Sequence, residues 1–395
     1  MLESLYLKSV ENKDSLTDLI EDYELKDLKV EDHWNDYEMS KLDEDYVIAA
    51  GDGSSNLKSF YSFLFYGISS ESIIYDKTLK LKNPLKNNVK NILENNFKNN
   101  LENNLENNLN APNNVINNLK IIESSDLNVI DNNEYSKERI RNYMGIFEIK
   151  NAFYCLETNK IDYYLYDGSL LGDLIRPLPG EKRLKKDVKA KIISMAHEFF
   201  NDEIKMDKIE ITSNKIDNEF WEREFDNISE FELKFYLENI EKLFAISNLL
   251  KHRKKIVAVS KTSTANDYFH LKIPDIGIFD SYSKKTGYTN KKVKTLSDNI
   301  KYAFPVNNEF FKSLKFTIFY IRLCNNKNIL KVELPYNANK EDIEKIIAVL
   351  ANESTEGYPY LLKKTHHDVV ISKKDMENLS NIVGLYGKYG REMLG

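Results

Sequence analysis

The chain of 395 residues has few cysteines, no long apolar run and no cluster of glycines. Its two cysteines, Cys155 and Cys324, lie far apart and form no CxxC pair, which excludes a disulfide framework and a cysteine-based zinc site. We expect both to be small buried side chains. No run approaches the roughly 18 apolar residues that can cross a bilayer, so no membrane partner is expected. The 14 glycines form no glycine-rich loop, which disfavours nucleotide-binding classes that depend on one.

The overall composition is that of a folded globular protein. Hydrophobic residues make up 42% and charged residues 30% of the chain, so extensive disorder is excluded. The length alone allows one large domain or two ordinary ones. The start of the chain, MLESLYLKSVENKD, lacks the basic and then apolar layout of a signal peptide, which predicts a cytoplasmic protein.

The formal charge of −6 is unevenly distributed. Residues 1–45 hold 15 Asp and Glu against 5 Lys and Arg, a balance of −10, so the rest of the chain carries +4. Residues 176–191 contain seven basic and two acidic side chains, and residues 251–261 contain five basic and no acidic ones. Patches of this kind can neutralise phosphates whatever the global charge is, which is compatible with a nucleic-acid partner. A merely solvated lysine-rich surface is the alternative.

Two segments differ from the rest in composition. The acidic segment at residues 2–42 has apolar residues at helical spacing and no Gly or Pro, which predicts one or two amphipathic helices. Residues 83–118 contain 17 Asn in 36 positions with repeated ENNL units, which is typical of a low-complexity helical or disordered insertion without chemistry. We therefore divide the chain into an acidic helical N-terminal segment, 1–45, and one domain, 46–395, that carries the insertion.

The remaining sequence alternates predicted strands and helices. DYVIAAGDGSSN (45–56) predicts a buried strand that stops in a turn at Asp52, and the aromatic and β-branched residues 60–76 continue it as a hairpin. IDYYLYDGSLL (161–171) predicts a second buried strand that ends at Asp167. Strands mixed with crossover helices indicate an α/β sheet. Further strands are expected at KKIVAVSKTS, FTIFYIRLC and NILKVELP, and helices over 137–157, roughly 184–252, and 339–354.

Two strands that end in Asp-Gly-Ser place Asp52 and Asp167 at the same edge of a sheet if the strands are neighbours. Mg²⁺ and Mn²⁺ prefer such hard oxygen ligands, and two ions about 3.5–4 Å apart stabilise both oxygens of a phosphoryl displacement. Glu148, on the apolar side of the predicted helix 137–157, is a third candidate ligand. The glycine after each aspartate is expected to leave room for a substrate backbone. A single Asp-Gly-Ser is a weak signal, because Asp-Gly pairs occur in ordinary turns.

Five segments together resemble the NurA nuclease family in order and spacing: AAGDGSS (49–55), IFEIKNAF (146–153), YYLYDGSLL (163–171), VAVSKTS (257–263) and GYPYLLKKTHHDVVIS (357–372). The resemblance implies an RNase H-like core, in which a mixed sheet is flanked by helices. It implies manganese-dependent cleavage of DNA, with magnesium as an option, by 5′→3′ exonuclease and also single-strand endonuclease action. It further implies a homodimer that acts on single-stranded DNA and duplex ends with a HerA-type hexameric ATPase in DNA end resection.

The same resemblance assigns site residues. Asp52 and Asp167 fall on the family's two metal-binding aspartates, and Glu148 is chosen as the helix glutamate, with Glu157 as its competitor. Two positions near the C-terminus compete for the family's histidine, namely His366 and, with a slip of one residue, His367. Lys261, after the third strand, would approach a phosphate or the nucleophile; the alternative is a solvated lysine.

Three questions stay open at this stage. Asp275 and Asp280 are further carboxylates that the sequence does not place. An actin-like or sugar-kinase ATPase also uses a strand-end aspartate, although its pattern is Asp-x-Gly followed by glycine-rich loops that are missing here. A non-catalytic DNA-end-binding subunit would have an incomplete acidic set, whereas this set is complete in the sequence.

Overall fold

The computed structural model describes most of the chain. The Asn-rich insertion expected at 83–118 lies outside the described residues apart from Asn118, as do residues 177–183 of the basic segment 176–191. The described residues are 2–15, 28–40, 42, 44–79, 118–176, 184–203, 209–216, 225, 230–299 and 303–385.

One mixed sheet of ten strands organises the described part of the chain, in the order β1-β7-β9-β10-β6-β5-β2-β3-β4, with β8 paired to β9. β5 is parallel to both of its neighbours, and the other pairs in the sheet are antiparallel. β11 and β12 form a separate small hairpin. The strands are β1 Trp34–Asp36, β2 Val47–Ser59, β3 Phe63–Asp76, β4 Leu119–Asp131, β5 Tyr163–Asp167, β6 Ile256–Ser260, β7 Gly287–Thr289, β8 Lys292–Thr295, β9 Lys315–Arg322, β10 Leu330–Leu334, β11 Ser354–Thr355 and β12 Tyr358–Pro359.

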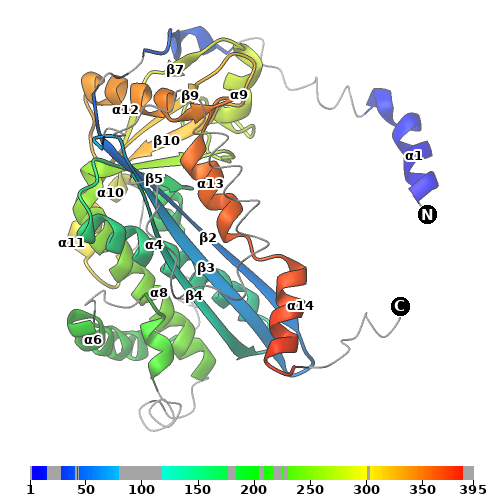
Figure 1. Ribbon diagram of the computed structural model, residues 1–395, viewed down its shortest axis with the longest axis vertical. Helices are drawn as coiled ribbons and strands as arrows, with labels where there is room; N and C mark the ends of the chain where they lie inside the picture. The colour runs from blue at the N-terminus through cyan, green and yellow to red at the C-terminus, as the bar shows by residue number, and fades with distance from the viewer. Residues whose placement is uncertain are drawn as a thin grey trace.

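Helices cover both faces of the sheet (Figure 1). α4 packs on β2 and β3 with α8 behind it, whereas α13 and α14 lie along the opposite face of the same strands. The helices are α1 Leu2–Glu11, η1 Val30–Asp32, α4 Ser136–Thr158, α5 Leu170–Ile175, α6 Lys186–Glu203, η2 Thr212–Lys215, α8 Glu230–Leu249, η3 Leu250–Lys255, α9 Asp275–Tyr282, α10 Leu296–Asn299, α11 Asn308–Ser313, α12 Lys340–Asn352, α13 Tyr360–Val369 and α14 Lys373–Ile382. Within the described ranges no helix is both long and apolar enough to span a membrane.

Alternating side chains divide the core into two layers. On the central strand, Tyr164 and Tyr166 pack into the cluster under α4 and α8, and Leu165 packs into the cluster under α12 and α13. The predicted helix 339–354 is α12, and it begins with a capping box at Asn339. Cys155 is buried as expected, but Cys324 is only half-buried because it follows β9 in the turn of a hairpin.

Two expectations about the strands and helices are wrong. The first strand does not stop at Asp52 but continues to Ser59, because β3 pairs with it along its whole length. The acidic segment is helical at α1, but residues 34–36 form the edge strand β1, which pairs with β7. The interpretation as helices alone missed this strand because three residues are too few for a visible period.

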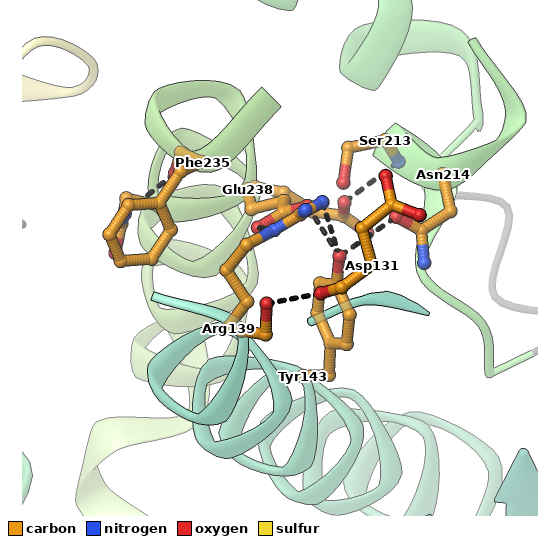
Figure 2. Close-up of polar contacts among 10 residues, drawn as sticks. Asp131, Arg139, Tyr143, Ser213, Asn214, Phe235 and Glu238 are labelled. Atoms are coloured by element: carbon orange, nitrogen blue, oxygen red, sulfur yellow. Dashed lines mark hydrogen bonds and ion pairs between the residues drawn. The ribbon is translucent and has the colours of Figure 1, made fainter. Parts of the chain in front are cut away.

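Two buried ion pairs fix α4 to α8, and Figure 2 shows the one between Arg139 and Glu238. Arg139 donates to both carboxylate oxygens of Glu238, at 3.1 and 3.0 Å, and to the Tyr143 hydroxyl at 2.7 Å. Two residues after Glu148, Lys150 pairs with Glu241 at 2.5 Å. Removing one partner of such a pair leaves a buried charge and costs about 3–5 kcal/mol, so α4 has little freedom to move.

Candidate active site

The two Asp-Gly-Ser strands are neighbours, as the sequence-based prediction requires. β2 and β5 run parallel with Gly51 opposite Tyr166, so Asp52 and Asp167 follow side by side. One ligand atom from each of Asp52, Asp167 and His366 lies within 4.8 Å of the others. In the described part of the chain, these three form the only group of His, Cys, Asp and Glu side chains with this proximity.

Asp52 is buried, with 8% of its surface exposed. One carboxylate oxygen accepts the Gly53 N–H at 2.8 Å, and the other lies 2.7 Å from Nδ1 of His366 on α13. Burial and then the charge of Asp167 raise the pKa of Asp52. The His366 side chain is 58% exposed, so water reaches a ring that a carboxylate holds in place.

Asp167 has a different set of partners. Lys261 follows β6, and its Nζ donates to one Asp167 oxygen at 3.1 Å. The Tyr358 hydroxyl donates to the same oxygen at 3.3 Å, and the Lys261 ammonium lies 4.7 Å from the Tyr358 ring centroid. Burial and the charge of Asp167 raise the pKa of Tyr358, which keeps its hydroxyl protonated as a donor.

Tyr358 is a site residue that the sequence analysis did not identify. It stands eight positions before His366 in the segment GYPYLLKKTHHDVVIS. Among 24 tyrosines in the chain, nothing local separates it from those of the core. Its position close to His366 in the sequence was the only indication that Tyr358 could belong to the site.

Glu148 lies on α4, outside the close group formed by Asp52, Asp167 and His366. It is buried, and its Oε1 has no hydrogen-bond partner. Burial first, and then the charges of Asp52, Asp173 and Asp167, raise its pKa well above the ordinary value. An orphaned carboxylate oxygen beside two further carboxylates is an environment that a hard divalent cation would satisfy, so these residues fit Mn²⁺ or Mg²⁺.

The glycine of the first motif has a different role from the expected one. A Cβ atom on Gly53 would lie 3.3 Å from Cβ of Glu148 and 3.4 Å from Cγ of Met144. Gly53 therefore makes room for α4, and the expectation that it leaves space for a substrate is wrong. The space over this glycine is already filled by the helix.

The two alternative residues from the sequence analysis, Glu157 and His367, lie away from the aspartates. Glu157, nine residues beyond Glu148 on α4 and so about 13 Å along its axis, pairs with His252 at 2.7 Å. The side chain of His367 is 86% exposed and points toward Asp368 rather than toward either aspartate.

The two unplaced carboxylates also have other partners. Asp275 is buried and accepts the backbone N–H groups of Tyr268 and Phe269. Asp280 pairs with Arg322 at 2.7 Å and with Lys284. Neither belongs to the group around Asp52.

Comparison with known proteins places the chain in a family. A family model described as the NurA domain matches residues 46–371. The chain belongs to the NurA family. It is therefore a nuclease.

Individual NurA proteins are similar to this chain over nearly its whole length. The chain is 28% identical to a protein of Methanocaldococcus jannaschii named probable DNA double-strand break repair nuclease NurA, over 93% of this chain and 85% of that one. The crystal structure of the NurA nuclease from Sulfolobus solfataricus superposes with a TM-score of 0.67 at 21% identity, covering 97% of each chain. A structure of NurA bound to dAMP and manganese gives a TM-score of 0.62 at 16% identity over both full chains.

Proposed function

We propose that this NurA protein hydrolyses DNA phosphodiester bonds with two Mn²⁺ ions held by Asp52, Glu148 and Asp167 on an RNase H-like core, with Mg²⁺ as an option. The observation that carries the proposal is the convergence of two strand carboxylates with His366 beside a buried, unpartnered Glu148. A relative named as a DNA double-strand break repair nuclease and a NurA structure with dAMP and manganese support it.

The protein's own groups divide the chemistry between them. Bound ions would supply positive charge and acidify a water molecule. Lys261 lies at the exposed side of Asp167 and can approach a phosphate oxygen. The Tyr358 ring contacts its ammonium, while the Tyr358 hydroxyl donates to the same Asp167 oxygen. His366 keeps Nδ1 on Asp52, and its Nε2, which makes no hydrogen bond in the described part of the chain, can transfer a proton to or from the reacting oxygens.

The cellular role extends this proposal. We propose 5′→3′ exonuclease action on DNA ends and single-strand endonuclease action, in end resection by a cytoplasmic homodimer with a HerA-type hexameric ATPase. The acidic N-terminal segment supports a protein contact, because a balance of −10 repels phosphates. On α1, the apolar side chains Leu5, Tyr6, Leu7 and Val10 are all more than 60% exposed.

The two competing functions have less support. The sequence does not contain the glycine-rich loops that an actin-like or sugar-kinase ATPase requires. A non-catalytic DNA-binding subunit would have lost part of the acidic set, whereas Asp52 and Asp167 lie close together and their charges act on the buried Glu148.

The deciding experiment replaces Asp52 or Asp167 with Asn, which removes a metal-binding charge and keeps the side-chain volume. We expect both Asp52→Asn and Asp167→Asn to reduce Mn²⁺-dependent DNA cleavage to background, with unchanged circular dichroism spectra. Glu157→Gln is the matched control and should cleave normally, because it pairs with His252 away from the site. Full activity in either aspartate variant would overturn the metal-site assignment.

A further inference from the structure

Helix α13 lies across β2 and presents different groups on its two flanks. Its buried residues, Leu361, Leu362, Thr365 and Val369, face the sheet. Successive helical residues differ by about 100°, so the residues on either side of Thr365 project to opposite flanks. His366 projects to one flank and reaches Asp52. Lys364 and Asp368 share the other flank, where their side chains pair at 2.5 Å and are 9% and 13% exposed.

The second flank meets a buried glutamate of β3. Glu71 is directly opposite Asp52 in the antiparallel β2–β3 pair, so both side chains project to the α13 face of the sheet. Glu71 is 6% exposed, and its Oε1 has no hydrogen-bond partner. Burial first, then the charges of Asp368 and Glu123, and a hydrogen bond with Asp368 raise the pKa of Glu71 to about 8, whereas the charge of Lys364 lowers it.

This polar cluster is costly compared with an apolar contact. Buried ion pairs often contribute no more stability than well-packed hydrophobic residues of similar volume, because both charges lose water. Their geometry is specific, however. Apolar packing of α13 tolerates small rotations, whereas the contact of Glu71 with the Lys364–Asp368 pair is satisfied in one orientation.

The rotation of α13 bears directly on His366. A rotation of about 10° moves an atom about 6 Å from the helix axis by about 1 Å. A misplacement of about 1 Å can cost about 10²-fold in rate. A contact that fixes the second flank of α13 would therefore affect the rate of cleavage more than the stability of the fold.

We propose that Glu71, acting through Asp368 and Lys364, is a positioning residue that fixes the rotation of α13 and so holds the His366 imidazole on Asp52. The inference rests on the proposed catalytic role of His366. Two residues after the end of α13, Ile371 is also held to β2. Its N–H donates to Ser54 Oγ at 3.2 Å, and its carbonyl oxygen accepts from Asn56 Nδ2 at 2.8 Å.

The kinetic test compares three variants on a fluorescent oligonucleotide at saturating Mn²⁺. Glu71→Leu should lower kcat by about 10- to 100-fold with a KM within about threefold of wild type. Glu71→Gln, which retains a hydrogen-bond donor toward Asp368, should restore most of kcat. Glu123→Leu is the matched control, because Glu123 lies directly opposite Glu71 on β4 and is exposed, so that this variant removes a charge that acts on Glu71 but keeps Glu71 itself. Equal losses in Glu71→Leu and Glu71→Gln would overturn the inference.

A double-mutant cycle separates positioning from general structural damage. In the His366→Ala background, measured by single-turnover cleavage, Glu71→Leu should cause no further loss. The same fold-loss in both backgrounds would show that Glu71 does not act through His366. If Glu71→Leu does not fold, Asp368→Asn breaks the same contact and takes its place in the cycle.

A spectroscopic readout needs no activity. The chain has six histidines, so the His366 ring signals in long-range ¹H–¹⁵N spectra can be assigned by their loss in His366→Ala. They should shift in Glu71→Leu and return in Glu71→Gln, and unmoved signals would overturn the inference. Active Asp52→Asn would instead overturn the proposed function, while the ring signals would still report on the position of His366.

Discussion

The tripeptide Asp-Gly-Ser occurs twice at the site, with two different backbone structures. The first copy, residues 52–54, lies in the middle of the long strand β2. The second copy, residues 167–169, ends β5: Gly168 has φ +130°, and Ser169 caps α5. Identical sequences therefore give a continuous strand in one case and a strand-to-helix turn in the other.

The partners of each strand explain the difference. Beyond Gly51, β2 leaves β5 but keeps β3 beside it, so its backbone groups stay hydrogen-bonded as a strand. β5 lies between two strands, and its last contact is the bond from Gly168 N to Val259 O at 3.0 Å. The chemistry requires only that the two carboxylates be adjacent, and the parallel register of β2 and β5 achieves this. The glycine and the serine therefore have different structural roles in the two copies.

The largest effect should come from the third carboxylate, which α4 directs beside the first copy. Glu148→Gln keeps the volume but removes the charge, so cleavage should fall to background. The same change should stabilise the metal-free protein, because a buried charge near Asp52 is unfavourable. Thermal unfolding in EDTA, beside Glu157→Gln as a control, measures this gain. A lower melting temperature for Glu148→Gln would contradict the view that Glu148 is strained without metal.

The stability difference should depend on pH. The pKa of Glu148 in the folded state is raised above the ordinary value of 4.5. The native state therefore holds a proton that the unfolded state has lost, and the stability of the wild type falls as pH rises from about 4.5 toward the raised pKa. Gln does not titrate, so the advantage of the variant should grow as pH rises from about 4.5 toward the raised pKa of Glu148. Mn²⁺ should stabilise the wild type more than the variant.

Replacing His366, the partner of Asp52, should have a different effect on activity from replacing Lys261, the partner of Asp167. His366→Ala should lower the maximal rate by about 10²–10⁴-fold even at saturating Mn²⁺, the range for loss of a proton-transfer group. Lys261→Ala should have a smaller effect on kcat and weaken DNA binding, because an exposed ammonium contributes mainly charge. His367→Ala is the control. If excess Mn²⁺ rescues His366→Ala, His366 is a metal ligand, and if only His367→Ala is impaired, the register is off by one.

The two glycines offer a finer contrast. Gly53→Ala adds a Cβ 3.3 Å from Cβ of Glu148, and α4 is fixed by buried ion pairs, so the contact should displace Glu148. We expect about a tenfold loss of activity with a stability cost of about 1 kcal/mol. Gly168→Ala meets no close side chain but forces alanine to φ +130°, which costs about 1–3 kcal/mol in stability. Activity and urea unfolding of both variants decide this, and a larger stability loss in Gly53→Ala would reverse the assignment.

The sequence predicted the two aspartates of the site better than it predicted the structure around them. The apolar runs before Asp52 and Asp167 predicted two strands, whose carboxylates would meet only if the strands were neighbours. The resemblance to the NurA family, rather than the local pattern, supplied the metal-binding assignment. The continuation of β2 could not be predicted, since it depends on β3 as a partner rather than on residues 53–59 themselves. Tyr358 and Glu71 were missed because a tyrosine or a strand glutamate acquires its meaning only from distant neighbours, here Asp167 and α13.

The smallest effects should come from the two serines. Ser169 Oγ accepts the Gly172 N–H at 2.9 Å and donates to the buried carboxylate of Glu333 at 2.6 Å, so Ser169→Ala should cost about 1–2 kcal/mol. Ser54 Oγ only accepts the Ile371 N–H, at 3.2 Å, so Ser54→Ala should cost about 0.5–1 kcal/mol. Ser55→Ala is the matched control, because its hydroxyl contacts only a methionine sulfur at 3.7 Å. Urea unfolding of the three variants ranks them. If Ser54→Ala proves the most costly, the junction after α13, rather than the cap of α5, is the more important serine contact of the site.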